Sequence, residues 1–312
     1  MKDKTPYLSL CIPTYNRLDI LQNTLESIYS NLNEVDLCNF EVIVSDNEPN
    51  QSSKEIVDKF EYENIHYYST DCEGFLNSFK ALKYGKGSFL KLHNNYTTLR
   101  KGTLKSLIAE IRNNQCNKPT IFYTDGMKQF GSVRKFDTFN LFINELSYFS
   151  SWSTGFGIWK VDFDNCSFGL DINNYFPQTS LLLSQSFKSE FIINDKPLFK
   201  NQDVPKKGGY NIFKVFSVDY IRLIEQSYKR NEITIKTFKK IKSDLLLNYL
   251  SARYFKTVIM RTDNFDKNDI KKNLKIYYSA FSYYLLIISA LFSPIKFGIR
   301  KIEIIIFNIA KE

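Results

Sequence analysis

Polar side chains that can bind ligands gather in three short segments of the N-terminal half. Each segment directly follows an apolar run typical of a buried strand, and together they comprise residues 13–17, 46–48 and 93–95 (PTYNR, DNE and HNN). Hydroxyl, amide, carboxylate, guanidinium and imidazole groups can all hold a polar ligand. No G-x-G-x-x-G motif follows the first apolar run, and the chain has no G-x-x-x-x-G-K-[ST] motif. A dinucleotide-binding Rossmann site is therefore unsupported, and a P-loop is excluded.

The elements that must position these segments alternate along the chain. Apolar runs predict strands at residues 7–13, 40–45, 65–68, 88–92 and 120–123, and helical spacing predicts helices at 18–32, 53–60, 75–84 and 104–111. Such alternation indicates βαβ units and a mainly parallel sheet. Ligands bind such sheets outside the carboxyl ends of the strands, where the three polar segments lie.

Composition narrows the class of protein. The 312 residues are 43% hydrophobic and carry a formal net charge of +9, with 12 Gly and 8 Pro. This is ample material for a core and excludes collagen-like or largely disordered chains. Five scattered cysteines and two histidines favour neither a disulfide framework nor a multi-histidine metal site, and the polar N-terminus has no signal-like apolar core. We expect a cytoplasmic protein.

Three blocks of sequence carry a family resemblance. LSLCIPTYNR, EVIVSDNEPNQSS and ALKYGKGSFLKLHNN, in this order, resemble the family 2 glycosyltransferases, and among these the bacterial surface-polysaccharide transferases of the abequosyltransferase type. The resemblance implies a GT-A-like wound mixed α/β sheet flanked by helices. It also implies transfer of a sugar from a nucleoside-diphosphate donor, with inversion. We expect this catalytic domain at residues 1–212 and a helical region at 213–312.

The resemblance assigns the donor site. It places Pro13, Thr14, Tyr15 and Arg17 along the nucleotide, and Asp46 on its base or ribose. Asn77 matches a family residue near the donor. A carboxylate at a strand end can accept hydrogen bonds from a base N–H or from ribose hydroxyls. Asp46 could instead serve only to cap a turn.

The metal motif of the family is altered in this chain. Where the family has an Asp-x-Asp motif that binds Mg²⁺ or Mn²⁺, this sequence has His93, Asn94 and Asn95. His93 and Asn95 can still offer a ring nitrogen and a carbonyl oxygen to a divalent cation. Three alternatives follow: a cation held mainly by the diphosphate, metal-independent transfer with cationic side chains stabilising the leaving group, or a nucleotide-sugar- or glycan-binding relative that has lost activity.

The acceptor side is expected in the middle of the chain. The segment WSTGFGIWK brings Trp152, Thr154, Gly155 and Trp159, which the resemblance places near the acceptor. The tryptophans could stack on a sugar or belong to the core. The catalytic base is predicted to be Asp171, with Asp125 as the other candidate.

The C-terminal tail is basic and apolar. Residues 276–293 contain no charge, and residues 271–312 carry +5. A helical pair packed on the protein's own core, one transmembrane helix and an anchor in the bilayer interface all fit this pattern, and tyrosines beside Lys and Arg favour the anchor. We therefore expect a peripheral protein on the cytoplasmic face of the inner membrane, with no nucleic-acid partner, that acts on a lipid-linked or polysaccharide acceptor.

Overall fold

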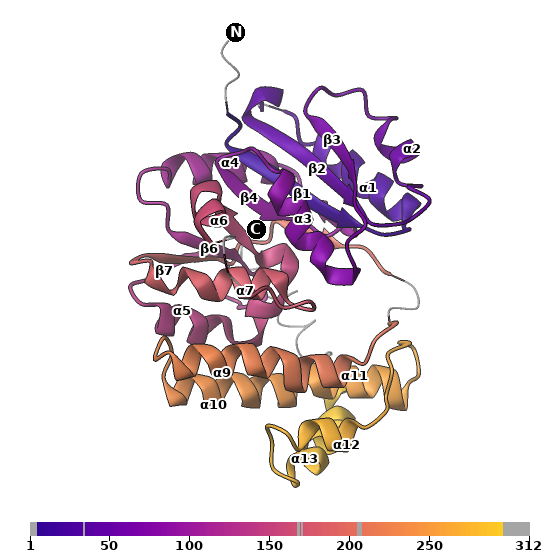
Figure 1. Ribbon diagram of the computed structural model, residues 1–312, viewed down its shortest axis with the longest axis vertical. Helices are drawn as coiled ribbons and strands as arrows, with labels where there is room; N and C mark the ends of the chain where they lie inside the picture. Colours follow the sequence, from indigo (N-terminus) through magenta and orange to yellow (C-terminus); the bar gives the residue numbers. More distant parts are fainter. Residues whose placement is uncertain (1–4, 34, 167–168, 170, 205–207, 296–312) are drawn as a thin grey trace. The chain divides into compact units, whose positions relative to one another are not determined.

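The computed structural model describes residues 5–33, 35–166, 169, 171–204 and 208–295. The chain divides into two compact units, Met1–Val204 and Pro205–Glu312 (Figure 1). Each unit is described by itself.

A five-stranded sheet organises the first unit. Its order is β3-β2-β1-β4-β8, with β1 to β4 parallel and β8 antiparallel to β4. The strands are β1 (Leu8–Thr14), β2 (Phe40–Asp46), β3 (Ile65–Ser69), β4 (Phe89–Leu92) and β8 (Gly157–Trp159). The predicted wound mixed α/β sheet is confirmed, and the first four predicted strands match β1 to β4 to within one residue at each end.

Helices cover both faces of this sheet. Leu8, Leu10 and Ile12 of β1 share one core with buried residues of α1 (Leu18–Tyr29), α2 (Lys54–Val57) and α4 (Thr103–Asn113). Because side chains alternate along a strand, Ser9 and Cys11 point to the other face. There α3 (Asn77–Tyr84) packs on β1 and β2. The sheet is therefore buried on both faces, as a parallel sheet requires.

Two smaller sheets complete the first unit. One has the order β6-β9-β7, from β6 (Thr120–Tyr123), β7 (Val133–Phe136) and β9 (Phe191–Asn194), and the other pairs β5 (Thr97–Leu99) with β10 (Phe199–Asn201). The remaining α-helices of the unit are α5 (Phe139–Leu146), α6 (Lys160–Cys166) and α7 (Pro177–Leu183). The strand predicted at 120–123 thus exists, but as β6 it joins β9 and not the main sheet.

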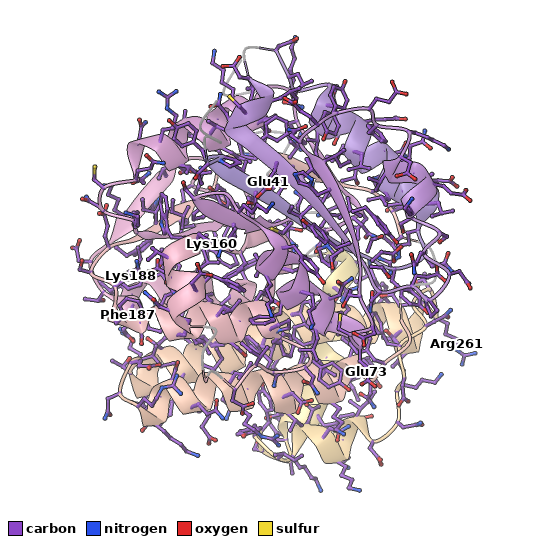
Figure 2. All side chains as sticks on the ribbon, turned by 45° about the horizontal axis from the view of Figure 1, so that its top comes forward. Glu41, Glu73, Lys160, Phe187, Lys188 and Arg261 are labelled. Atoms are coloured by element: carbon purple, nitrogen blue, oxygen red, sulfur yellow. The ribbon has the colours of Figure 1, made fainter. Side chains whose placement is uncertain are left out.

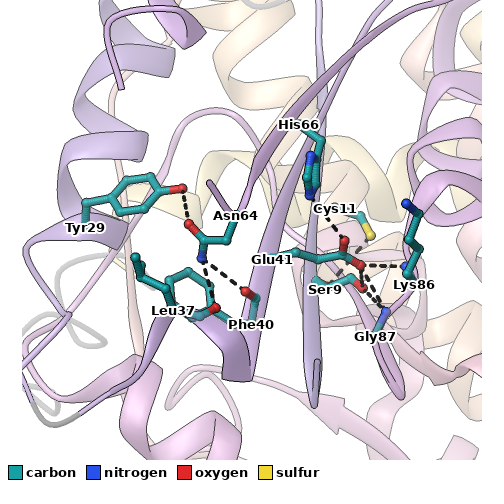
Figure 3. A network of polar contacts seen from close by, with 10 residues as sticks. All are labelled: Ser9, Cys11, Tyr29, Leu37, Phe40, Glu41, Asn64, His66, Lys86 and Gly87. Carbon is teal, nitrogen blue, oxygen red and sulfur yellow. Dashed lines mark hydrogen bonds and ion pairs between the residues drawn. The ribbon is translucent and has the colours of Figure 1, made fainter. Parts of the chain in front are cut away.

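A buried carboxylate fixes the amino-terminal side of the main sheet. Glu41 of β2, labelled in Figure 2, is 3% exposed. Its Oε1 accepts hydrogen bonds from the Ser9 hydroxyl at 2.6 Å and from the backbone N–H groups of Lys86 and Gly87 at 2.5 and 3.0 Å (Figure 3). His66 Nε2 lies 3.7 Å from the other oxygen. One side chain therefore connects β1, β2, β3 and the turn between α3 and β4.

The second unit is helical in its described part. Its helices are α8 (Ile212–Lys214), α9 (Ile221–Lys229), α10 (Ile235–Asp244), α11 (Ser251–Tyr254), α12 (Ile270–Leu274) and α13 (Ser282–Leu291). π-Helical turns at Val215–Tyr220, Leu245–Leu250 and Phe255–Ile259 continue these helices, so residues 212–229 and 235–259 run without a break. No helix among the described residues is long and apolar enough to cross a bilayer. The tail beyond residue 295, on which the anchor prediction partly rests, lies outside the described residues.

The division between the units falls earlier than the predicted boundary after residue 212. Strand β10 closes the first unit by pairing with β5. Gly208 already forms a bridge with Asn264 of the second unit, and the Asn211 side chain caps α8. Residues 208–212 therefore belong with the helices.

Candidate functional site

The carboxyl ends of β1 and β2 lie side by side in register. Thr14 is the direct partner of Asp46, and β1 then continues into the exposed residues Tyr15 and Asn16. Tyr15 is 56% exposed, and Asn16 has a φ of 45°, a conformation that asparagine tolerates better than most residues. Pro13 is half-buried. This part of the predicted donor site is therefore assembled by strand pairing.

Asp46 is fully buried and has two partners. Its Oδ1 accepts the backbone N–H of Glu48 at 3.0 Å, and its Oδ2 accepts the Tyr67 hydroxyl at 3.1 Å. The first bond forms an Asx turn that shapes the loop after β2. Burial, together with the Asp46 charge, raises the pKa of Tyr67, so this hydroxyl stays a donor. Each carboxylate oxygen keeps a second lone pair.

Asn77 fastens the two strand ends together. Its amide nitrogen donates to the Thr14 and Ser45 carbonyls at 3.1 and 2.8 Å and to the Asn47 side chain at 3.0 Å. Its carbonyl oxygen accepts the Ser45 hydroxyl at 2.6 Å. With 3% exposure, Asn77 holds the loops after β1 and β2 in place.

Asn95 and Arg17 connect the loop after β4 to the same edge. Asn95 Nδ2 donates to the Thr14 hydroxyl at 2.9 Å, and Arg17 Nη1 donates to Asn95 Oδ1 at 3.5 Å. The Asn95 backbone carbonyl accepts the Thr24 hydroxyl at 2.8 Å. The Arg17 guanidinium also lies 6.0 Å from the centre of the Tyr96 ring. A half-buried cation therefore stands beside the segment that replaces the acidic motif.

His93 turns away from this edge into the core. It is fully buried, its Nε2 lies 2.6 Å from the Thr97 carbonyl, and its ring meets Phe199 edge-on at 5.9 Å. Burial, and secondly the Lys91 ammonium, lower the pKa of His93 to about 3. Because Nε2 must donate to the carbonyl, Nδ1 is the unprotonated nitrogen, and it is buried with no hydrogen-bond partner among the residues that the structure describes.

The segment at residues 151–155 adjoins the loop after β4. Ser153 donates to Asn94 Oδ1 at 2.7 Å, and Lys91 Nζ donates to the Thr154 carbonyl at 2.5 Å. Burial lowers the pKa of Lys91 to about 7. A Cβ at Gly155 would lie 2.3 Å from the Phe122 ring and 2.6 Å from the Tyr123 carbonyl, so only glycine fits there.

The two tryptophans of this segment differ in burial. Trp152 is half-buried at the margin of the core. Trp159 is 1% exposed, donates its indole N–H to the Pro119 carbonyl at 2.7 Å and packs edge-on against Phe89. Trp159 is therefore a core residue of β8 with no face open for stacking on a sugar, and Trp152 alone keeps an accessible face.

The two candidate bases occupy different settings. Asp125 has a φ of 52°, and its Oδ1 accepts the backbone N–H groups of Leu198 and Phe199 at 2.7 and 2.8 Å. Partial burial raises its pKa, and its bonds hold the start of β10. Asp171 is exposed in the loop before α7. That loop approaches the segment after β3, where the Tyr175 and Phe75 rings lie 6.2 Å apart.

The donor set around residues 93–95 does not fit a divalent cation. Hard cations prefer carboxylate oxygens. Here His93 is buried, Asn95 is engaged by Thr14 and Arg17, and Asn94 Oδ1 by Ser153. In the described part of the chain, no three His, Cys, Asp or Glu side chains group as metal ligands. A guanidinium beside Asn95 would also repel a cation.

Several contacts within the site were not predicted. Tyr67 on Asp46, Ser153 on Asn94 and Asn47 on Asn77 are all contacts between segments that are distant in the sequence. The strand-end rule singled out residues 46–48, which include Asn47, but it did not identify the partner of Asn47. Nothing in the sequence pairs Ser153 with Asn94.

Comparisons with known proteins agree with this fold. Residues 9–170 match the profile of glycosyl transferase family 2. The S. aureus TarS 1-349 structure has 15% identity and a TM-score of 0.54, over 91% of this chain and 88% of that one, and its complex with UDP gives the same values. The mannosyltransferase PcManGT from Pyrobaculum calidifontis, in complex with GDP-Man and Mn²⁺, has 14% identity and a TM-score of 0.52, over 93% and 81%. A search of curated protein sequences found no match. The GT-A fold is thereby confirmed.

Proposed function

Because this chain belongs to glycosyl transferase family 2, it is a glycosyltransferase that uses a nucleotide-sugar donor, and we propose a more specific reaction. It transfers a sugar from a nucleoside diphosphate to a lipid-linked or polysaccharide acceptor in bacterial surface-glycan synthesis, with inversion. The acceptor hydroxyl attacks the anomeric carbon, the nucleoside diphosphate leaves on the opposite side, and a carboxylate takes the hydroxyl proton. The resemblance to abequosyltransferase-type enzymes suggests a hexosyl or deoxyhexosyl group.

The observation that carries this proposal is the arrangement at the carboxyl edge of the sheet. Thr14 and Asp46 are partners in register, and Asn95 joins Thr14 from the third loop. Ligands of wound sheets bind at this edge. The TarS and PcManGT structures of the same fold were solved with UDP and with GDP-Man. A nucleoside diphosphate at the edge lined by residues 14–17, 46–48 and 94–95 is consistent with both.

In this proposal, the Arg17 guanidinium stabilises the negative charge of the leaving diphosphate. A metal ion is one way to stabilise the departing phosphates, and a fixed guanidinium is another. Arg17 is the cation that contacts Asn95, at the point where the family has carboxylates. We therefore propose transfer that is independent of divalent cations.

Asp171 is the proposed base. It is exposed in the loop that leads into α7, whereas Asp125 is occupied by two backbone N–H groups. The N-terminal turn of α7 is tied to the segment before Thr154, because Gln178 and Thr179 donate to the Ser151 and Ser150 carbonyls at 2.7 and 3.1 Å. Trp152, Thr154 and Gly155 would then border the acceptor on the same side.

A membrane-borne acceptor would explain the basic, apolar C-terminal part. The described portion of that part includes α13, which is too short to span a bilayer. Peripheral association with the inner face of the inner membrane is therefore the proposed localisation.

The test is turnover of nucleotide sugars with and without a chelator. The full chain is incubated with UDP-, GDP-, CDP- and dTDP-sugars, with EDTA or with Mn²⁺, and release of the nucleoside diphosphate is measured. Release from one class of donor that EDTA leaves within about twofold supports the proposal. Loss of release in EDTA with rescue by Mn²⁺ would overturn metal independence. A donor that raises the melting temperature without any release or transfer would indicate a non-catalytic binding relative, which the loss of the acidic motif makes the second candidate.

A further inference from the structure

Helix α13 (Ser282–Leu291) leaves most of its large apolar residues exposed and buries mainly small or polar ones. Its inward side carries Ser282, Leu286, Ser289 and Ala290, all buried, and Ser289 donates to the Leu247 carbonyl at 2.7 Å. Its outward side and flanks carry large apolar residues that are 37–63% exposed, namely Phe281, Tyr284, Leu285, Ile288, Leu291 and Phe292. These outward positions recur at helical spacing, so they form one continuous apolar face.

A cavity rich in lysine adjoins this face. It has a volume of about 580 Å³, and its charged lining residues are Lys267, Asp269, Lys271, Lys272 and Lys275. Lys271 Nζ lies 5.7 Å from the centre of the Tyr283 ring and 5.4 Å from that of Tyr284. Tyr283 also lines the cavity. The cationic cavity and the apolar face therefore meet at these two tyrosines.

Net positive charge is confined to the unit that carries these features. Residues 205–312 contain 21 Lys and Arg against nine Asp and Glu, a formal charge of +12, whereas residues 1–204 carry −3. At long range, an extended anionic surface is therefore attracted to the second unit more strongly than to the first.

We propose that α13 and the lysine cavity dock the second unit on an anionic lipid bilayer. The apolar face enters the boundary between headgroups and acyl chains, and lipid phosphates occupy the cavity beside Lys272 and Lys275. A helix of ten residues is about 15 Å long and lies in the interface, since a bilayer core is about 30 Å thick. This inference rests on the proposed function, in which a membrane carries the acceptor.

The test is flotation of the full chain with vesicles of phosphatidylcholine alone or with 30% phosphatidylglycerol. Cationic side chains near an anionic surface each contribute on the order of 1 kcal/mol to binding. The pair Lys272→Gln and Lys275→Gln should therefore weaken partitioning about tenfold or more. Its control is Lys236→Gln with Lys239→Gln, two exposed lysines of α10 outside the cavity, which should weaken it less than threefold.

A second pair tests the apolar face. Ile288→Ser with Leu291→Ser should abolish flotation. Leu141→Ser with Val161→Ser, two apolar residues of α5 and α6 that are also about half exposed, should leave it unchanged. Release of nucleoside diphosphate from the donor should stay at the wild-type rate in all four variants.

Three results would overturn the inference. The first is equal binding to neutral and anionic vesicles. The second is no vesicle binding, with a Tm lowered in the Ile288 and Leu291 variant, which would mean that residues 296–312 cover the face. The third is a dimer in light scattering that only this variant dissociates. Loss of vesicle binding with intact donor turnover rejects only the docking surface, whereas absent turnover in a protein that binds vesicles rejects the proposed reaction.

Discussion

Arg17 and Asn95 show how this site differs from one built around a bound cation. In place of carboxylates, the loop after β4 offers amides, and one of them contacts a guanidinium at 3.5 Å. An arginine keeps its charge at every physiological pH and can hold phosphate oxygens with two parallel hydrogen bonds. In the proposed reaction, the cation that stabilises the leaving diphosphate is thus a side chain of the protein.

The first prediction concerns this cation. Arg17→Ala should lower kcat/KM for donor turnover about 100-fold, because one strong hydrogen-bond donor to the developing charge is lost. Arg17→Lys should recover part of the loss, since the charge returns without the planar geometry. Arg222→Ala, an exposed arginine of α9 in the second unit, is the control and should match the wild type. Full activity of Arg17→Ala would contradict the role given to Arg17.

The second prediction concerns the base. Asp171→Asn should lower kcat for transfer by at least about 100-fold, because the acceptor hydroxyl loses its proton acceptor. Donor affinity, measured by calorimetry, should stay unchanged. Asp137→Asn, an exposed aspartate ahead of α5, should have no effect. If Asp125→Asn instead abolished transfer and left the Tm unchanged, the base would be Asp125.

At the residue scale, strand ends were predictable and side-chain directions were not. Thr14 and Asp46 meet because both end parallel strands of one sheet, which the apolar runs already indicated. His93 immediately follows a strand, and the following turn decides which way it points. That turn brings the Thr97 carbonyl to its ring and buries it. Trp159 is buried by β8, a strand of three residues, too short to leave a periodic signal.

At the scale of elements, the Glu41 network connects the strands at the amino-terminal side of the sheet, opposite the edge that carries the site. A third prediction follows: Glu41→Ala should lower the free energy of unfolding by about 3 kcal/mol, because it leaves buried donors on Ser9 and Gly87 without an acceptor. Glu41→Gln, which keeps one acceptor oxygen, should cost about 1 kcal/mol. Urea denaturation measures both, with Glu55→Ala on the exposed side of α2 as the control. If Glu41→Ala and Glu55→Ala lowered the free energy of unfolding equally, the Glu41 network would not be what stabilises the sheet.

The fourth prediction concerns how the free energy of unfolding depends on pH through Glu110 of α4. Burial raises the pKa of Glu110, whose carboxylate accepts two contacts from Asn194 at 3.0 and 3.1 Å. A raised pKa means that the folded protein binds this proton more tightly than the unfolded chain. Glu110 therefore stabilises the fold below its unfolded pKa, near 4.5. That contribution is lost as pH rises through the higher folded pKa.

Glu110→Gln should remove this dependence. Over the affected window, the free energy of unfolding of the wild type should fall relative to that of the variant by up to about 1.4 kcal/mol per pH unit. Denaturation at intervals between pH 4 and pH 8 measures the difference. Parallel curves for the two proteins would show that Glu110 titrates normally.

Elements with long apolar runs could be predicted, and partnerships between distant segments could not. β1, β2 and β4 are central and buried, so their sequences are almost uninterrupted apolar runs. The run at 120–123 reads the same way, yet it pairs with β9, about 70 residues later. Periodicity identifies a strand but does not say which sheet it joins.

At the scale of the whole molecule, the two units carry opposite formal charge, −3 and +12. The sequence alone indicated a basic tail. It could not reveal that α13 turns its large apolar residues outward, because an apolar run without charges has no preferred face.

The fifth prediction follows from this separation of charge. Raising NaCl from 50 to 500 mM shortens the Debye length from about 14 to about 4 Å, so it should release the full chain from anionic vesicles in flotation. Donor turnover by the vesicle-free protein should change less than about threefold, because the site lies in the unit with little net charge. Equal salt sensitivity of the two measurements would contradict the assignment of separate surfaces.

The register between Thr14 and Asp46 has a consequence for how such enzymes diversify. Seven consecutive pairs lock β1 to β2, so inserting one residue in either strand would reverse the facing of every side chain beyond it. The proposed acceptor side, in contrast, includes the loop at residues 171–175, which is exposed or half-buried, and such surface loops tolerate changes in sequence and length. Under the proposed function, variation in this loop would change the acceptor while the strand pairing that builds the donor site stays the same.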